Sequence, residues 1–333
     1  LILLLSNFYS VDILQCSRIT GALFLNYNDG MTKSSEHRVK SQSFSLAAKV
    51  KDYMLLIKFT LSFTVVFSCV ICYLLAPKVV EYDWYMILLL FLAGMLITGS
   101  ANAINQAVEK DTDAMMKRTS KRPVANGNMS QNEAYTFALI AGLVGVGMMW
   151  YYFNFSSALV SAFSLFLYAF IYTPLKKINS IAVLIGALPG ALPCLIGWVA
   201  GNDDFALGGW VLFGMQFLWQ FPHFWAIAWV AHADYTKAGF KLLPADKGPT
   251  KFTAIQTIMY SFLMIPIGMV PYFIGLTGIT SLWIVLVCNL FMVFQSARLY
   301  KEMDVKAARR VMFSSYIYLP IVLLAMLADK INH

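Results

Sequence analysis

Nine long apolar stretches follow one another along this sequence, and short polar segments separate them. An α-helix needs about 20 apolar residues to cross the hydrocarbon core of a bilayer. The stretches therefore predict nine transmembrane helices, or eight if the shortest merges with its neighbour. They cover Met54–Ala76, Trp84–Asn105, Glu133–Phe153, Ser157–Tyr172, Ser180–Ala200, Ala206–Val230, Thr253–Ile274, Thr280–Arg298 and Val311–Ala328.

The composition agrees with a membrane location. Of the 333 residues, 59% are hydrophobic and only 13% are charged, whereas soluble domains are roughly 45–50% apolar and about 25% charged. So few charges cannot cover a globule in water. The sequence therefore predicts an all-α, polytopic membrane bundle, and it excludes an ordinary soluble enzyme, a disordered chain and a secreted disulfide scaffold.

The basic residues of the loops are concentrated on one side of the predicted bundle. With nine helices, the loops after the first, third, fifth and seventh hold only Lys78. The loops after the second, fourth, sixth and eighth hold sixteen: Lys110, Lys117, Arg118, Lys121, Arg122, Lys176, Lys177, Lys237, Lys241, Lys247, Lys251, Arg298, Lys301, Lys306, Arg309 and Arg310. Basic loops stay in the cytoplasm. This bias predicts a cytoplasmic N-terminus, and it explains the net charge of +8 without a nucleic acid partner.

The sequence divides into an N-terminal segment and a membrane domain. Residues 1–52 are predicted to be an extension and a cytoplasmic tail, and residues 53–330 the membrane domain. The chain begins with Leu, so Met31 is the predicted true start, with residues 1–30 as an upstream extension. A short signal or an unusual start codon is the alternative.

A polar segment after the second predicted helix carries three oxygen-bearing side chains at helical spacing. On a helix, Asn105, Glu109 and Asp113 lie on one face, and Asp111 lies on the opposite side. Mg²⁺ prefers such oxygen ligands and is often shared with substrate phosphates. The segment continues with Lys117, Arg118, Lys121 and Arg122, and Arg side chains bind phosphate in a bidentate manner. The alternative is a solvated loop in which these charges pair with each other.

Two further groups of polar residues are predicted at the same, basic side of the membrane. Asp234 follows the sixth predicted helix and provides a second carboxylate patch, so that the two patches at one mouth would hold Mg²⁺ ions on a shared diphosphate. If that helix is continuous, His223 lies on the same face as Asp234, about 16 Å away; the alternative is an ordinary packed histidine. Tyr172 and Lys176, four residues apart, face a phosphate together or form a membrane-interface tyrosine with a snorkelling lysine.

These motifs, taken together, resemble a known family. Asn105-x-x-x-Glu109-x-x-x-Asp113 and Tyr172-x-x-x-Lys176 are similar to motifs of the UbiA superfamily of intramembrane prenyltransferases. Further strings resemble the branch of that superfamily that farnesylates haem, and the likeness extends over residues 55–328. These strings are Met116-Lys-Arg118-Thr-x-x-Arg122-Pro123, Gly190-Ala191-x-Pro193, Gly197-Trp198, Trp219-Gln220-x-Pro222-His223-Phe224-Trp225, Asp234-Tyr235-x-x-Ala238-Gly239 and Leu243-Pro244.

The resemblance implies a reaction and a set of site residues. Farnesyl diphosphate and haem b would be the substrates and haem O the product, made in the bacterial inner (plasma) membrane with the active site on the cytoplasmic side. Mg²⁺ would be held by the catalytic residues Asn105, Glu109, Asp113 and Asp234. The diphosphate would be bound by Arg118, Lys121, Arg122, Tyr172 and Lys176. Haem would be bound by Trp219, Gln220 and His223, with His223 as an axial iron ligand and a haem A synthase as a further partner.

One motif departs from the family pattern, and two alternative functions remain open at the level of sequence. The superfamily often has a second carboxylate four residues before the last one, where this chain has Val230, so a second metal is less secure. Other members prenylate aromatic acids such as 4-hydroxybenzoate, whose carboxylate calls for an Arg in the pocket. A transporter would instead have carboxylates near the membrane midplane and inverted repeats.

Overall fold

The computed structural model describes residues 46–244 and 248–331. The chain divides into two compact units, Leu1–Lys49 and Val50–His333. Of the first unit only residues 46–49 are described, so the predicted start at Met31 lies outside the described residues. The predicted division at residue 52 stays a prediction.

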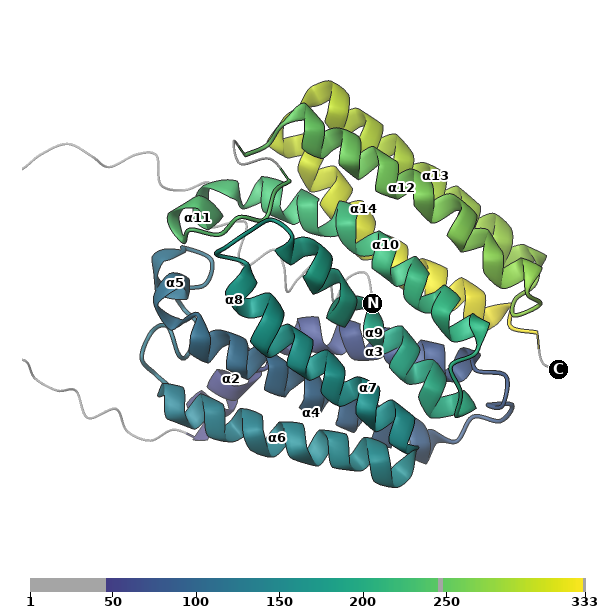
Figure 1. The fold of residues 1–333 in the computed structure, drawn as a ribbon, viewed down its shortest axis with the longest axis horizontal. Helices are drawn as coiled ribbons and strands as arrows, with labels where there is room; N and C mark the ends of the chain where they lie inside the picture. The colour runs from purple at the N-terminus through teal and green to yellow at the C-terminus, as the bar shows by residue number, and fades with distance from the viewer. Residues whose placement is uncertain (1–45, 245–247, 332–333) are drawn as a thin grey trace, which may run out of the picture. The chain divides into compact units, whose positions relative to one another are not determined.

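The described residues form helices joined by loops and turns, which confirms the all-α prediction (Figure 1). The long helices correspond to the predicted spans. Their bounds, with those of the short helices between them, are α2 Leu46–Leu56, α3 Phe59–Leu75, α4 Trp84–Val108, α5 Lys110–Met115, α6 Gln131–Tyr152, α7 Phe155–Phe166, a π-helical turn Leu167–Tyr172, α8 Thr173–Leu175, α9 Ala182–Asn202, α10 Leu207–Val230, α11 His232–Lys237, α12 Lys251–Phe273, α13 Ile279–Glu302 and α14 Val305–Ala328.

Seven of these segments are long and apolar enough to cross a membrane, and α2 with α3, bent by 52° at their junction, makes an eighth. The remaining long helix, α10, has 24 residues and no charged side chain. At 1.5 Å per residue it is about 36 Å long, which is enough to cross a bilayer. Four of its residues are tryptophans, and they lower its hydropathy because their indole N–H makes them less apolar than leucine. We therefore count α10 as the ninth span, in agreement with the sequence.

The helices of residues 50–333 pack in a closed ring. Consecutive long helices contact each other, as short connections require, and α14 returns to contact α3. The α9 helix also crosses α3 closely: a Cβ placed on Gly197 would lie 1.9 Å from the carbonyl oxygen of Cys69. Close crossings of this kind at small residues hold membrane helices together.

The contact between α3 and the C-terminal end of α14 is reinforced by one lysine. The Lys330 ammonium, just beyond α14, donates hydrogen bonds to the carbonyl oxygens of Leu74, Ala76 and Val79 at 2.8, 2.9 and 2.7 Å. These carbonyls lie at and beyond the end of α3, where helical partners run out. Lys330 therefore closes the ring by capping the first span.

The short helices α5, α8 and α11 lie together at one end of the ring (Figure 1). They belong to the loops in which the sequence concentrates its basic residues. The loop after α5 ends at a capping motif, in which the Ser130 hydroxyl accepts the backbone N–H of Glu133 and starts α6. All the predicted metal and diphosphate residues belong to this end.

Candidate active site

The segment from Asn105 to Asp113 places three oxygen donors on one buried face. The helix α4 ends at Val108, and the chain turns at Glu109 before α5 begins. The Asp113 N–H still donates to the Glu109 carbonyl, at 2.7 Å, so the helical direction is kept. Asn105, Glu109 and Asp113 are 1%, 3% and 1% exposed, whereas Asp111 is exposed. The predicted face is therefore buried and not solvated, but the charge pairing that the alternative expects is present, because Asp113 pairs with Arg122 of the same polar segment.

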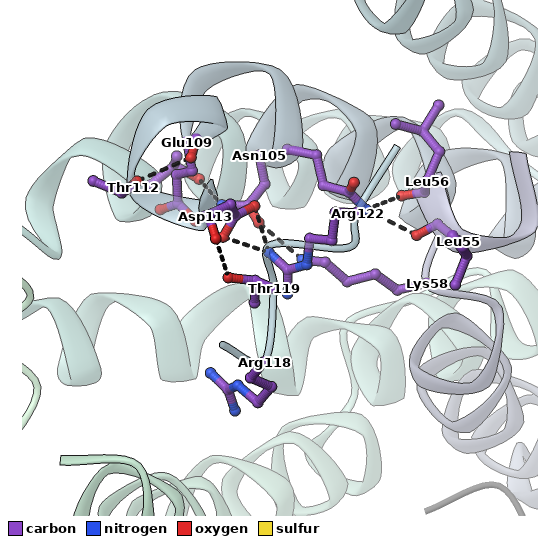
Figure 2. A network of polar contacts seen from close by, with 12 residues as sticks. Leu55, Leu56, Lys58, Asn105, Glu109, Thr112, Asp113, Arg118, Thr119 and Arg122 are labelled. Atoms are coloured by element: carbon purple, nitrogen blue, oxygen red, sulfur yellow. Dashed lines mark hydrogen bonds and ion pairs between the residues drawn. The ribbon is translucent and has the colours of Figure 1, made fainter. Parts of the chain in front are cut away.

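Each of these three side chains has a cationic partner from another part of the chain. The Lys58 Nζ donates to Asn105 Oδ1 at 2.8 Å. The Lys176 Nζ lies 2.6 Å from Glu109 Oε1. Arg122 Nη1 donates to both carboxylate oxygens of Asp113, at 2.8 and 2.7 Å. Figure 2 shows Lys58 and Arg122 reaching the α4–α5 segment from the same side. The burial of these carboxylates is therefore compensated by paired positive charge.

Lys176 is the most enclosed of the predicted diphosphate residues. It is 7% exposed, and its Nζ lies 4.9 Å from the ring centroid of Tyr172 and 5.3 Å from that of Phe240. The π-helical turn before α8 places Tyr172 over it. Because its ammonium is buried in an ion pair with Glu109, the snorkelling alternative is wrong.

The loop that follows α5 meets α11. Arg118 Nη2 donates to the Tyr235 hydroxyl at 2.8 Å, and the guanidinium lies 5.1 Å from the centre of that ring. The interaction with Tyr235 raises the pKa of Arg118. Half-buried Asp234 is the neighbour of Tyr235 on α11, so it lies at the same end of the ring. Lys121 is exposed, and none of the ion pairs seen among the described residues involves its ammonium.

Asp234 and the α4–α5 carboxylates do not form one compact group. Within residues 46–244 and 248–331, no three Asp, Glu, His or Cys side chains come together as they would around a metal ion. Two of the predicted ligands are carboxylates engaged with Lys176 and Arg122. The amide of Asn105 adds a third hard oxygen, so the donor chemistry fits Mg²⁺, although these oxygens already have cationic partners.

A second site is centred on His223, in α10. The His223 Nδ1 lies 2.8 Å from the Ser315 hydroxyl oxygen. That hydroxyl donates its one hydrogen to the Met312 carbonyl, at 2.6 Å, so it accepts from His223. The geometry therefore places the proton on Nδ1 and leaves the Nε2 lone pair available. His223 is 9% exposed.

Aromatic rings enclose this histidine. The Trp219 ring stacks on His223 with centroids 4.5 Å apart, and its Nε1 donates to the Ser315 carbonyl at 3.0 Å. Tyr316 lies edge-on at 5.1 Å. Gln220, by contrast, is directed at α9, where a Cβ on Gly190 would lie 2.6 Å from its Nε2. The structure thus brings Trp219 and His223 together and places Gln220 against a different helix.

One continuous helix through His223 and Asp234, which was the condition for their shared face, is not present. The helix α10 ends at Val230, Ala231 adopts a non-helical conformation (φ −96°, ψ 14°), and α11 begins at His232. Pro222, the residue before His223, lies inside α10 and does not end it. The shared-face argument for the two residues therefore does not hold.

The structure adds two residues that the motifs did not indicate, Lys58 and Ser315, and it gives a contact to Tyr235, which one of the motif strings contains. Lys58, Tyr235 and Ser315 contact Asn105, Arg118 and His223. Lys58 had a signal in the sequence, because it is the only charged residue in the apolar stretch Met54–Ala76, and a charge inside a predicted span often marks a functional site. Ser315 had none, because serines are common in membrane helices.

Comparison with known proteins gives a consistent family. The model of the UbiA prenyltransferase family matches residues 65–318. A protein of Cytophaga hutchinsonii named protoheme IX farnesyltransferase is 44% identical over 286 residues, which are 86% of this chain and 100% of the relative. A protein of Flavobacterium psychrophilum with the same name is 39% identical over 84% of this chain and 94% of its own length.

Solved structures share the fold. A digeranylgeranylglyceryl phosphate synthase matches with a TM-score of 0.71 at 23% identity, covering 85% of this chain and 98% of that one. A UbiA homolog from Archaeoglobus fulgidus, bound to GPP and Mg²⁺, matches with a TM-score of 0.65 at 14% identity, covering 83% and 99%. With the family match over most of the chain and relatives above 30% identity, the chain belongs to the UbiA prenyltransferase family.

Proposed function

We propose that this protein transfers the farnesyl group of farnesyl diphosphate to the 2-vinyl group of haem b, with addition of water, to give haem O and diphosphate. The observation that carries the proposal is the 44% identity to a protein named protoheme IX farnesyltransferase along that protein's full length. The family match, residues 65–318, includes every metal, diphosphate and haem residue that the sequence predicts.

The α4–α5 face is the proposed place of a divalent cation. Asn105, Glu109, Asp113 and Asp234 would hold Mg²⁺, and a family fold from Archaeoglobus fulgidus is described with GPP and Mg²⁺. When bound, the ion would supply positive charge to the leaving diphosphate.

The cations around this face are proposed to bind and stabilise the diphosphate. They are Arg118, Lys121, Arg122 and Lys176, with the Tyr172 hydroxyl as a hydrogen-bond donor. As the bond between farnesyl C1 and oxygen breaks, its electron pair remains on the diphosphate. Fixed positive groups stabilise that developing charge, and they do so most strongly where water is excluded. Lys176, which is 7% exposed, meets this condition best.

The His223 site is the proposed place of haem b. The vinyl π electrons would form the new bond to farnesyl C1, and the cation left on the side chain would be captured by water, which then loses a proton. No side chain has to form a covalent intermediate. The hydrogen bond from Nδ1 to Ser315 leaves the His223 Nε2 lone pair for the haem iron, as in metal sites where the second ring nitrogen is fixed by a hydrogen bond. Trp219 and Gln220 would complete the pocket wall.

The orientation follows from the distribution of charge. The loops at the end that holds α5, α8 and α11 are rich in Lys and Arg, so we propose that this end faces the cytoplasm of a bacterial inner membrane. Farnesyl diphosphate would then bind from the cytoplasmic side. A haem A synthase, which consumes haem O, is the proposed partner.

One assay tests the reaction. The purified protein in lipid vesicles is incubated with haem b, farnesyl diphosphate and Mg²⁺, and the products are identified by mass spectrometry. We expect haem whose mass has risen by one farnesyl group and one hydroxyl, because its vinyl group has become a hydroxyethylfarnesyl group, with no product from Asp113→Ala. If haem stays unmodified while added 4-hydroxybenzoate is prenylated, the chain is a prenyltransferase of a different substrate class and the proposal is wrong.

A further inference from the structure

Lys58 lies at a break in the first span, and side chains of another helix stabilise this break. It lies between α2 and α3 in the left-handed region (φ 48°, ψ 58°), a conformation that costs a non-glycine residue free energy and recurs at functional sites. Side chains of α4 donate hydrogen bonds to the carbonyls around the break. Asn102 Nδ2 donates to the Ile57 carbonyl at 3.1 Å, and Gln106 Nε2 donates to those of Leu55 and Leu56 at 2.8 and 2.9 Å.

The consequence of this break is the position of one ammonium group. The Lys58 Nζ donates to Asn105 Oδ1 at 2.8 Å, on the helix that also braces the break (Figure 2). Asn105 is 1% exposed and is the first of the four proposed metal ligands. Lys58 is therefore the cationic partner of Asn105. In the same way, Lys176 is the cationic partner of Glu109, and Arg122 is that of Asp113.

We propose that the Lys58 ammonium occupies the Asn105 oxygen until a divalent cation displaces it. This competition makes the binding of the divalent cation depend on the binding of the diphosphate. This inference rests on the proposed function. A divalent ion on the α4–α5 face would use the oxygens that now lie against the three cationic side chains. Without a diphosphate, the displaced positive charges would remain close to the metal ion and repel it. With a diphosphate, they gain its oxygens as partners.

The coupling has a definite sign for Lys58. A neutral side chain at residue 58 removes one competitor, so a metal ion alone binds more tightly. The same change removes one positive charge from the diphosphate, so the prenyl diphosphate binds more weakly in the presence of metal. Linkage requires metal and diphosphate to raise each other's affinity by one common factor, and the substitution reduces that factor.

The test measures Mn²⁺ binding to the whole protein in nanodiscs by electron paramagnetic resonance, with and without farnesyl thiodiphosphate as an unreactive probe. We expect wild-type protein to bind Mn²⁺ weakly alone. Lys58→Met, similar in length and uncharged, is expected to bind Mn²⁺ alone roughly tenfold more tightly and to bind the thiodiphosphate roughly tenfold more weakly at fixed Mn²⁺. Lys58→Arg, which keeps the charge, is expected to resemble wild type.

Three controls separate the outcomes. Lys177→Met, an exposed lysine next to Lys176, is expected to leave both affinities unchanged. Lys58→Asn tolerates the left-handed conformation, so its agreement with Lys58→Met excludes a folding defect. If Lys58→Met leaves Mn²⁺ affinity unchanged or lower while wild type still couples the two ligands, Lys58 is structural and the inference is wrong. If wild type binds no Mn²⁺ even with the thiodiphosphate, the proposed metal site fails together with it.

Discussion

At the scale of single residues, the Lys176 ammonium and the Glu109 carboxylate illustrate how the end that holds α5, α8 and α11 is stabilised. The two groups lie 2.6 Å apart, with side chains 9% and 4% exposed. An ion pair in such surroundings adds little net free energy of folding, because both charges lose hydration. Removing one member is costly, because the other charge is left buried without its partner.

This contrast predicts a double-mutant result. Lys176→Met and Glu109→Gln are each expected to destabilise the protein, Lys176→Met by about 3–5 kcal/mol because it strands a buried carboxylate. The double variant is expected to be more stable than Lys176→Met. Thermal unfolding in detergent, followed by tryptophan fluorescence, measures the three changes. Additive losses would show that the two groups do not interact.

Ser315 is the second residue whose role can be isolated. Ser315→Ala removes the acceptor that holds His223 Nδ1–H, and loss of such an outer partner typically lowers metal affinity 10–100-fold. We therefore expect haem b to bind this variant at least tenfold more weakly, with a lower unfolding temperature because a buried N–H loses its acceptor. Titration of the Soret band measures the affinity, and Ser315→Thr, which keeps the hydroxyl, serves as the control. Equal affinity in Ser315→Ala and wild type would contradict the assignment.

At the scale of elements, the turn between α9 and α10 shows how one carboxylate organises two helix ends. Asp204 Oδ1 accepts from the Asn202 side chain at 2.8 Å, from the Ala206 N–H at 3.1 Å and from Trp198 Nε1 at 3.3 Å. The hydrogen bond from Asn202 is the main reason why the pKa of Asp204 lies below its ordinary value of 3.8. The turn is therefore held by the ionised form.

The sign of that shift gives a pH dependence. A carboxyl with a lowered folded-state pKa stabilises the protein above its unfolded-state pKa, and the effect is lost as the pH falls through the folded-state value. Asp204→Ala is thus expected to lower the unfolding temperature at pH 7, and the difference from wild type is expected to shrink below about pH 3.8. Unfolding temperatures at pH 7, 4 and 3 measure this. A constant difference would mean that the hydrogen bonds do not require the charge.

At the scale of the whole molecule, the parts predictable from sequence are those set by local pattern. Each predicted span has a helix within a few residues of its bounds, because apolar length alone decides whether a segment crosses a bilayer. The buried face of Asn105, Glu109 and Asp113 also follows from helical spacing. The remainder depends on contacts between distant residues, such as His223 with Ser315, 92 residues apart, which no local pattern contains.

The predicted span Ala206–Val230 ends where α10 ends, but the sequence left open whether the helix continues to Asp234. Pro222 removes one backbone donor, which a long helix tolerates when its neighbours pack around it, so α10 continues to Val230. Ala231, where the helix does end, carries no breaking signal. The left-handed turn at Lys58 was missed, because α4 side chains stabilise it across the bundle.

Closure of the ring is testable at Lys330. Lys330→Met removes three hydrogen bonds to the end of α3, each worth about 1 kcal/mol or more for a charged donor. The variant is expected to unfold at a lower temperature while its Kd for farnesyl thiodiphosphate stays unchanged, because Lys330 lies beyond α14 and away from α5, α8 and α11. A control, Lys306→Met, removes an exposed lysine from the same helix pair. Unchanged stability in Lys330→Met would mean that packing of α14 on α3 closes the ring without it.

The contact between the first and the last span has a consequence for biosynthesis. A ribosome delivers α3 first and α14 only after seven other spans have entered the membrane, so no incomplete set of helices can close the ring. Until then the carbonyls of Leu74, Ala76 and Val79 lack the ammonium that later binds them. A truncated chain therefore leaves the end of α3 without these hydrogen bonds and without its contact to α14. Membrane quality control could distinguish it from the finished protein by this feature.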